Sequence, residues 1–313
     1  MGVEARVVLY APTGALADEA ARAGFSRIRQ LDSILSDYRP ESELSRVSAG
    51  AHAATMPLGD DLFTVLRIAD ALARETGGAL DVTAGSLVRL WRDARSTGVL
   101  PASDAFCEAR SRAGWRHITL DTAARTLRFD VPGIELDAGA IGKGYAADAA
   151  LAAIRARGID RALVSIGGDL VAGRAPPGVR GWTVSIATDS SPRILAIAHA
   201  AVSTSGDAEQ GVVIGGVRYS HIVDPRTGEA LTSGVSVTVR AASGVESDAW
   251  ATAASVLDAS DRASFIAARP SADFYVRGGT SAGMSSRTNE RSSCARSPDS
   301  TNVVRTFTRM RGK

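Results

Sequence analysis

Apolar residues recur with a helical period in several stretches of the chain. The longest is Ala15–Leu35, where Ala17, Ala21, Phe25, Ile28, Leu31 and Leu35 share one face. The polar stretch that follows, Ser36–Arg46, is expected to be a loop with a short helical turn. Further helices are predicted over Asp60–Glu75, Ser86–Ala94, Ala102–Ala113, Tyr145–Arg157, Ser247–Leu257 and Asp261–Arg269.

The remaining hydrophobic segments alternate with a period of two, as strands do, beginning with Glu4–Tyr10. His117–Asp121 pairs naturally with Thr126–Asp130, and Val212–Val223 is typical of a hairpin with a two-residue turn at Gly215-Gly216. Other predicted strands are Ala162–Ala172 (interrupted at Gly167–Asp169), Trp182–Ala187, Ile194–His199, Ala201–Thr204, Val235–Ala241 and Ala272–Arg277. Hairpins with helices inserted in blocks predict an α+β fold rather than a doubly wound sheet.

Composition narrows the class of protein without naming a partner. The chain has 313 residues, 45% of them hydrophobic, and a net charge of +2. Residues 281–313 carry seven Arg or Lys against two Asp or Glu, so the basic balance belongs to this tail and gives no reason to expect nucleic acid. We expect one domain over residues 1–280 and a disordered Ser/Arg-rich basic tail over 281–313. The chain opens without a charged-then-apolar leader and has no bilayer-length apolar run, so the expected location is the cytoplasm.

The stretch Leu136–Ala146 is the strongest candidate for chemistry. Three glycines separate a strand-like run from a predicted helix, and a helix N-terminus after such a turn offers free N–H groups to an anion. Lys143 lies at that point and is the only lysine before the C-terminal residue. In a chain that otherwise uses arginine, it suggests a site that needs a compact ammonium group. The alternative is an ordinary Gly-rich turn with a surface lysine.

Two further groups could carry chemistry. Asp248 and Thr252 are four residues apart on a predicted helix, and their oxygens suit Mg²⁺, although Ser247 or Asp248 could equally be the helix N-cap. His221 precedes the turn Asp224-Pro225, where it could act as an acid or a base, or be structural.

A third group lies in the first half of the chain. The run Gly77–Thr83, together with Trp91, could hold a flat heterocycle. Alternatively, the two glycines simply end a helix and Trp91 packs in the core. Neither a Gly-x-Gly-x-x-Gly nor a Walker A motif occurs in the chain, which weakens dinucleotide-fold and P-loop interpretations.

Taken together and in order, these motifs resemble those of the ApbE-type flavin transferases, the FAD:protein FMN transferases. The resemblance spans about residues 1–278. The matching pieces are Met1-Gly2, Ser36–Tyr38 with Ser42–Ser45, Gly78–Thr83 with Trp91, Leu136–Ala146, Ile166–Asp169, Ser205–Asp207, His221–Gly228 and Ser247–Thr252.

The resemblance implies an ApbE-like α+β fold with a T-fold-like core, a requirement for Mg²⁺, and FAD as the donor. FMN would pass through its phosphate to a Ser or Thr of an acceptor protein, and AMP would leave. The side chains of Asp248 and Thr252 resemble the metal ligands, with the carbonyl of Ala140 as a backbone ligand and Ala251 beside Thr252. His221 matches a proposed catalytic histidine, Asp207 is a less favoured substitute, and Lys143 would neutralise phosphate charge. The positions that resemble FAD contacts are Met1, Tyr38, Ala79, Leu80, Asp81, Asp137, Lys143 and Ile222.

The resemblance also implies a protein partner. The chain contains no acceptor motif of the form Asp-x-x-Ser/Thr-Gly-Ala-Thr/Ser, so we expect the acceptor to be a different protein. Many relatives are exported and lipid-anchored, whereas this chain starts at the family's first motif, as an intracellular or trimmed form would. Two other functions use the same residues: a Mg²⁺-dependent FAD pyrophosphatase that yields FMN and AMP, and a non-catalytic FAD-binding protein.

Overall fold

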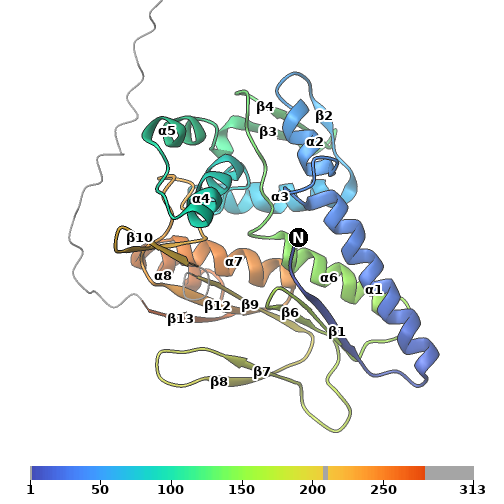
Figure 1. Ribbon diagram of the computed structural model, residues 1–313. Helices are drawn as coiled ribbons and strands as arrows, with labels where there is room; N and C mark the ends of the chain where they lie inside the picture. The colour runs from blue at the N-terminus through green and yellow to red at the C-terminus, as the bar shows by residue number, and fades with distance from the viewer. Residues whose placement is uncertain (1, 207–210, 279–313) are drawn as a thin grey trace, which may run out of the picture. The chain divides into compact units, whose positions relative to one another are not determined.

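A six-stranded antiparallel sheet, with strand order β1-β5-β6-β9-β12-β13, runs through the protein (Figure 1). The structure is a computed structural model that describes residues 2–206 and 211–278. The six strands are β1 (Ala5–Leu9), β5 (Ala162–Ile166), β6 (Asp169–Ala172), β9 (Ala200–Gly206), β12 (Ser236–Ala241) and β13 (Asp273–Arg277). The predicted α+β class and antiparallel pairing are therefore confirmed.

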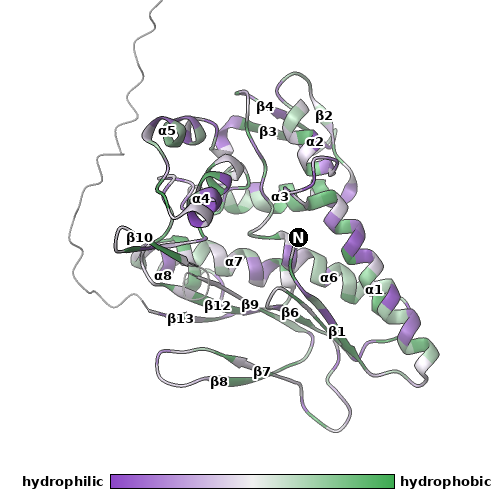
Figure 2. Ribbon diagram, in the orientation of Figure 1, coloured by the Kyte–Doolittle hydropathy of each residue, from purple (hydrophilic) through white to green (hydrophobic). Residues whose placement is uncertain are grey.

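Both faces of this sheet are covered. Helices α6 (Gly142–Arg155) and α7 (Gly244–Val256) pack on one face, and α1 (Gly14–Leu35) lies against α6. The hairpin of β7 (Trp182–Ile186) and β8 (Arg193–Ile197) covers the opposite face (Figure 1). Alternation dictates this arrangement, since every second residue of β7 is buried against the sheet while its neighbours face outward. Helix α1 is amphipathic in the same way: Figure 2 shows both hydrophobic and hydrophilic residues along it.

A second layer of elements lies beyond the helices. It contains α2 (Glu43–Gly50), α3 (Asp60–Glu75), the short helix η1 (Trp115–His117) and a three-stranded sheet of β2 (Met56–Pro57), β4 (Thr126–Phe129) and β3 (Ile118–Asp121). Its buried residues join α1, α6 and α7 in one continuous hydrophobic core. This core fixes the position of the segment Ile134–Ala138, whose buried side chains lead directly into α6.

A smaller cluster holds α4 (Gly85–Thr97) and α5 (Ser103–Ser111) to the hairpin of β10 (Gly211–Ile214) and β11 (Val217–Ser220). Helix α8 (Ala259–Ala267) follows α7. Trp91 of α4 is fully buried, stacks on Tyr219 and donates a hydrogen bond from Nε1 to the carbonyl of Gly228 at 2.8 Å. Of the two interpretations of Trp91, the structure therefore supports the core residue.

Helices α6 and α7 cross at their first turns, and two glycines make the crossing possible. A Cβ placed on Gly144 would lie 2.0 Å from the carbonyl oxygen of Gly244, so only glycine fits there. In addition, backbone N–H groups of each helix donate hydrogen bonds to a carboxylate on the other. Asp148 of α6 accepts hydrogen bonds from the N–H groups of Gly244 and Val245, and Asp248 of α7 accepts one from Gly144. This crossing brings residues 143 and 248 together.

The structure corrects three local predictions. A full helix, α2, begins at Glu43, where a loop with a short turn was expected. Ser42 is its N-cap, because the Ser42 hydroxyl accepts a hydrogen bond from the backbone N–H of Ser45. Helix α6 begins at Gly142 rather than Tyr145, so Lys143 lies within its first turn. Helix α7 begins at Gly244 with a capping box of Ser243 and Glu246, which rules out Ser247 or Asp248 as its N-cap.

Some predictions concern parts of the chain that lie outside the described residues. These are the tail over 281–313, Met1 and Asp207. Among the helices that the structure does describe, none combines the length and the apolar character that a membrane crossing would need.

Candidate functional site

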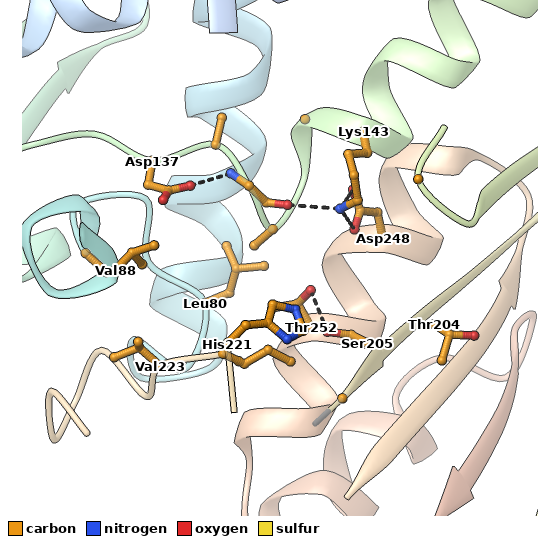
Figure 3. A pocket seen from close by; sticks show the side chains of 18 of the residues that line it. Leu80, Val88, Asp137, Lys143, Thr204, Ser205, His221, Val223, Asp248 and Thr252 are labelled. Carbon is orange, nitrogen blue, oxygen red and sulfur yellow. Dashed lines mark hydrogen bonds and ion pairs between the residues drawn. The ribbon is translucent and has the colours of Figure 1, made fainter. Parts of the chain in front are cut away.

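Most of the predicted site residues line one cavity of about 390 Å³, which lies beside the first turn of α6 and the Asp248–Thr252 part of α7 (Figure 3). Its walls come from segments that are far apart in the chain. They are the loop after α1, the α3–α4 loop, α4, the stretch 137–143, the end of β9, residues 221–225, β12 and α7. A cavity of this size, with mixed polar and apolar walls, suits a small-molecule ligand.

Lys143 lies at the centre of a charged cluster at one side of this cavity. Its Nζ is 3.3 Å from Asp248 Oδ1 and donates a hydrogen bond to the carbonyl of Gly139 at 3.1 Å (Figure 3). The same Nζ is 3.2 Å from Asp169 Oδ2. Burial alone would lower the pKa of Lys143, but the charges of Asp248 and Asp169 raise it above its usual value. The side chain is therefore a fixed cation in the wall of the cavity.

Asp169 is the second buried acid of the cluster. Its side chain is 4% exposed, and burial together with the charge of Asp248 raises its pKa, against the opposing effect of Lys143. Its Oδ2 accepts no hydrogen bond within the described residues, although the Lys143 ammonium lies at 3.2 Å. When both carboxylates are ionised, they exceed the single ammonium by one negative charge, which a second cation at this point would compensate.

Asp248 and Thr252 lie on the cavity face of α7, and Ala140 lines the same cavity. Thr252 donates a hydrogen bond from Oγ1 to Ser205 Oγ at 3.1 Å (Figure 3). Among the described residues, no three His, Cys, Asp or Glu side chains gather into a metal-binding group. A carboxylate, a hydroxyl and a backbone carbonyl form a donor set of hard oxygens, which fits Mg²⁺ and not a softer metal.

Most of the predicted FAD positions line the same cavity: Tyr38, Ala79, Leu80, Asp81, Asp137 and Ile222. Tyr38 is 61% exposed, and the guanidinium of Arg92 lies 4.0 Å from its ring centroid. Burial and the nearby charge of Asp37 raise the pKa of Asp137, whose Oδ1 accepts a hydrogen bond from Gly139 N. Asp81 also holds the local backbone, because its carboxylate accepts from Thr83 N and Trp115 N.

The remaining candidates fall into three cases. His221 lines the cavity and points into it, on the side of Ser205 and Thr252 (Figure 3). Ala251 is fully buried inside α7 and does not line the cavity, so any part it plays is through the helix backbone. Met1 and Asp207, as noted, lie outside the described residues.

Sequence reasoning missed several residues of the site. Asp169 belongs to the matching motif Ile166–Asp169, but the sequence indicates no role for it. Gly167 and Gly168 both have positive φ, so they form the tight turn that starts β6 at Asp169. Ser205, Arg92 and Arg95 also line the cavity. A Gly-Gly-Asp turn between two strands was the available signal for Asp169, whereas nothing in the sequence distinguishes Arg92 and Arg95 from other arginines on helices.

An antiparallel sheet covered by two crossing helices, with a charged cavity beside them, defines a class of ligand-binding α+β proteins. Comparison with known proteins shows which member of this class it is. A model of the ApbE family matches residues 1–276, and the chain belongs to that family.

Individual relatives agree with this assignment. FAD:protein FMN transferase of Treponema pallidum is 33% identical over 277 residues, which cover 82% of this chain and 76% of that protein. The protein of the same name from Klebsiella pneumoniae is 32% identical, over 72% of this chain and 67% of its own length. The solved structure of flavin transferase ApbE from Vibrio cholerae matches with a TM-score of 0.76 and 28% identity, over 88% of this chain and 94% of that one. The predicted family and fold are confirmed.

Proposed function

We propose that this protein transfers FMN from FAD to a Ser or Thr of an acceptor protein and releases AMP. The observation that carries the proposal is one cavity that is lined by Lys143 and Asp248 and also by Tyr38, Leu80, Asp137 and Ile222. Lys143 pairs there with Asp248 and also with buried Asp169. A charged cluster beside a partly apolar lining fits a molecule with a diphosphate between two ring systems. The names of the relatives describe transfer of FMN from FAD to a protein.

Asp248, Thr252 and the carbonyl of Ala140 would hold Mg²⁺. The buried Oδ2 of Asp169, which accepts no hydrogen bond within the described residues and faces only the Lys143 ammonium, supports a cation close by. When bound, Mg²⁺ supplies Lewis-acid stabilisation of phosphate charge. Lys143 places a permanent positive charge beside the diphosphate, where negative charge grows during phosphoryl transfer.

His221 would accept the proton of the acceptor hydroxyl. The acceptor oxygen then forms a bond to the FMN phosphorus, and the bond from that phosphorus to the AMP oxygen breaks, so AMP carries away the leaving electron pair. Asp207 is the alternative base. The acceptor would carry a motif of the form Asp-x-x-Ser/Thr-Gly-Ala-Thr/Ser.

The test uses the full chain with FAD, Mg²⁺ and a protein that bears this motif, followed by flavin fluorescence on a denaturing gel. We expect covalent flavin with the native chain, little with Asp248→Ala, and native levels with Asp160→Ala, which removes an exposed acid paired with Arg155. Release of free FMN and AMP without covalent flavin would instead identify a pyrophosphatase. Intact FAD after long incubation would identify a non-catalytic binding protein.

A further inference from the structure

Helix α4 presents three residues to the cavity at helical spacing: Val88, Arg92 and Arg95. The two arginines have different surroundings. Arg92 donates a hydrogen bond to Asp37 at 2.9 Å and lies over the ring of Tyr38, so its guanidinium is fixed. Arg95, less than one turn further along, makes neither a hydrogen bond nor an ion pair with any described residue, and its Nη1 is buried.

The charges around Arg95 make this isolation costly. Burial lowers the pKa of Arg95, the neighbouring cation Arg92 lowers it further, and the Tyr38 hydroxyl is the one opposing group. Arg95 as a residue is half-buried, but its Nη1 is fully buried without a hydrogen bond, and such a donor costs free energy because its lost hydration is not replaced. Nothing in the packing of the described residues uses the five donors of this guanidinium, so a ligand is the natural partner.

The chemistry of that ligand follows from what surrounds Arg95. The cationic group suited to a diphosphate is Lys143. It and its partners Asp169 and Asp248 belong to α6, β6 and α7 rather than to α4. At the α4 wall the cavity offers an aromatic ring, Tyr38, an apolar side chain, Val88, and one free hydrogen-bond donor group. A phosphate would need several converging donors, whereas a flat heterocycle needs a stacking surface and a donor for a ring nitrogen or carbonyl.

We propose that Arg95 is a specificity-determining residue that donates a hydrogen bond to the acceptor edge of one ring system of FAD. This inference rests on the proposed function for the identity of the ligand and adds the group that orients it. Both ends of FAD carry such an edge, the adenine nitrogens and the isoalloxazine carbonyls. The experiment distinguishes the two through FMN and AMP as separate probes.

The experiment measures dissociation constants of FAD, FMN and AMP, with Mg²⁺ present, for the native chain and Arg95→Gln. We expect FAD to bind about 10- to 100-fold more weakly to the variant, which is the effect of losing a hydrogen bond to a charged group. The loss should recur with FMN or with AMP but not with both. Arg95→Lys, which keeps a cationic donor, should recover part of the FAD affinity.

The matched control is Arg89→Gln on the same helix, since Arg89 pairs with Glu135 and lines a different cavity. It should leave all three constants unchanged. The melting temperature of ligand-free Arg95→Gln should equal or exceed that of the native chain, because the variant removes a buried Nη1 donor that has no partner among the described residues.

Unchanged FAD affinity in Arg95→Gln would overturn the proposal, as would equal weakening of FMN and AMP or a lower melting temperature without ligand. Failure of the proposed function is a separate result: FAD bound with an Arg95-dependent affinity but no covalent flavin formed on the acceptor.

Discussion

At the scale of single residues, the central feature is one lysine that serves two buried carboxylates. Lys143 faces Asp169 and Asp248 and also donates to the carbonyl of Gly139. A compact ammonium with three freely oriented donors can satisfy such a three-way arrangement. A planar guanidinium is larger and has its donors in a fixed fork. The use of lysine at position 143, in a chain whose other interior cations are arginines, therefore has a geometric reason.

We predict that Lys143→Arg keeps the positive charge but lowers the rate of flavin transfer about tenfold or more, because the fork displaces the carboxylates. Initial rates of covalent flavin formation at saturating FAD measure this. Arg155→Lys, an exchange at the exposed end of the same helix, serves as the control and should leave the rate unchanged. A fully active Lys143→Arg enzyme would mean that charge alone is needed at this position.

At the scale of elements, the site depends on how helices are held to one another. The crossing of α6 and α7 at Gly144 and Gly244 places Gly144 N within 2.9 Å of Asp248 Oδ2. On the other side of α6, Tyr145 donates to Asp61 of α3 at 2.7 Å, and Arg27 of α1 forms a bidentate pair with the same carboxylate. Polar contacts thus anchor the first turn of α6 from two directions.

Gly144→Ala should separate the two helices. The new Cβ would lie 2.0 Å from the carbonyl oxygen of Gly244 and 2.7 Å from Asp248 Cβ, and both belong to a rigid helix. We expect a loss of about 1–3 kcal/mol in the free energy of unfolding, together with loss of transfer activity. Urea denaturation measures the first. Gly14→Ala at the start of α1, where no atom lies within 4 Å, should not destabilise the protein.

Asp61 predicts a pH dependence of stability. Burial alone would raise the pKa of Asp61, but the hydrogen bonds from Arg27 and Tyr145 bring it below its usual value. A lowered pKa in the folded state means that the stabilisation is complete above the unfolded pKa of about 3.9 and is lost as the pH falls through the folded value.

Asp61→Asn should therefore be less stable than the native chain by about 1.5–3 kcal/mol at pH 7, and the difference should shrink toward pH 3. Chemical denaturation at both pH values tests this. Asp70→Asn on the same helix removes an i,i+4 pair with Arg74 and should cost only about 0.5 kcal/mol. A difference for Asp61→Asn that stays constant with pH would show that its charge does not matter.

At the scale of the whole molecule, one cavity connects elements from both halves of the sequence. Tyr38 and Leu80 line it from the first hundred residues, and Asp248 and Thr252 line it from α7. A ligand that contacts all of these segments binds the folded state alone. Binding is therefore linked to the stability of the entire domain rather than to one element.

FAD at a hundredfold excess over its dissociation constant should raise the free energy of unfolding by about 2.7 kcal/mol, or the melting temperature by roughly 5 °C. Thermal melts with FAD and Mg²⁺ measure the shift, and removal of Mg²⁺ with a chelator should reduce it. FMN alone should produce a smaller shift, because it lacks the adenosine half. A melting temperature indifferent to FAD would contradict the assignment of the cavity.

Much of the fold could be predicted from local pattern. The alternation in Val212–Val223 with Gly215-Gly216 predicts a hairpin, and both glycines have positive φ in the structure, as a two-residue turn requires. Helix α2 (Glu43–Gly50) was not predicted in full, because its apolar positions are few and its start depends on the Ser42 cap. Motif order was enough to predict the family, since eight weak signals in a fixed sequence are jointly specific.

What the sequence determined by itself was the type of each element, the order of the motifs and a short set of residues that could carry chemistry. The tertiary structure decided which of these meet. Lys143 and Asp248 are far apart along the chain, and no local pattern records that two glycines allow their helices to touch. Asp169 became a candidate, and Arg95 was distinguished from its neighbours, only once burial and the lack of partners were visible. Hydrophobic periodicity reports which face of its own helix or strand a residue occupies. A site depends instead on contacts between elements, which are set by how the elements pack.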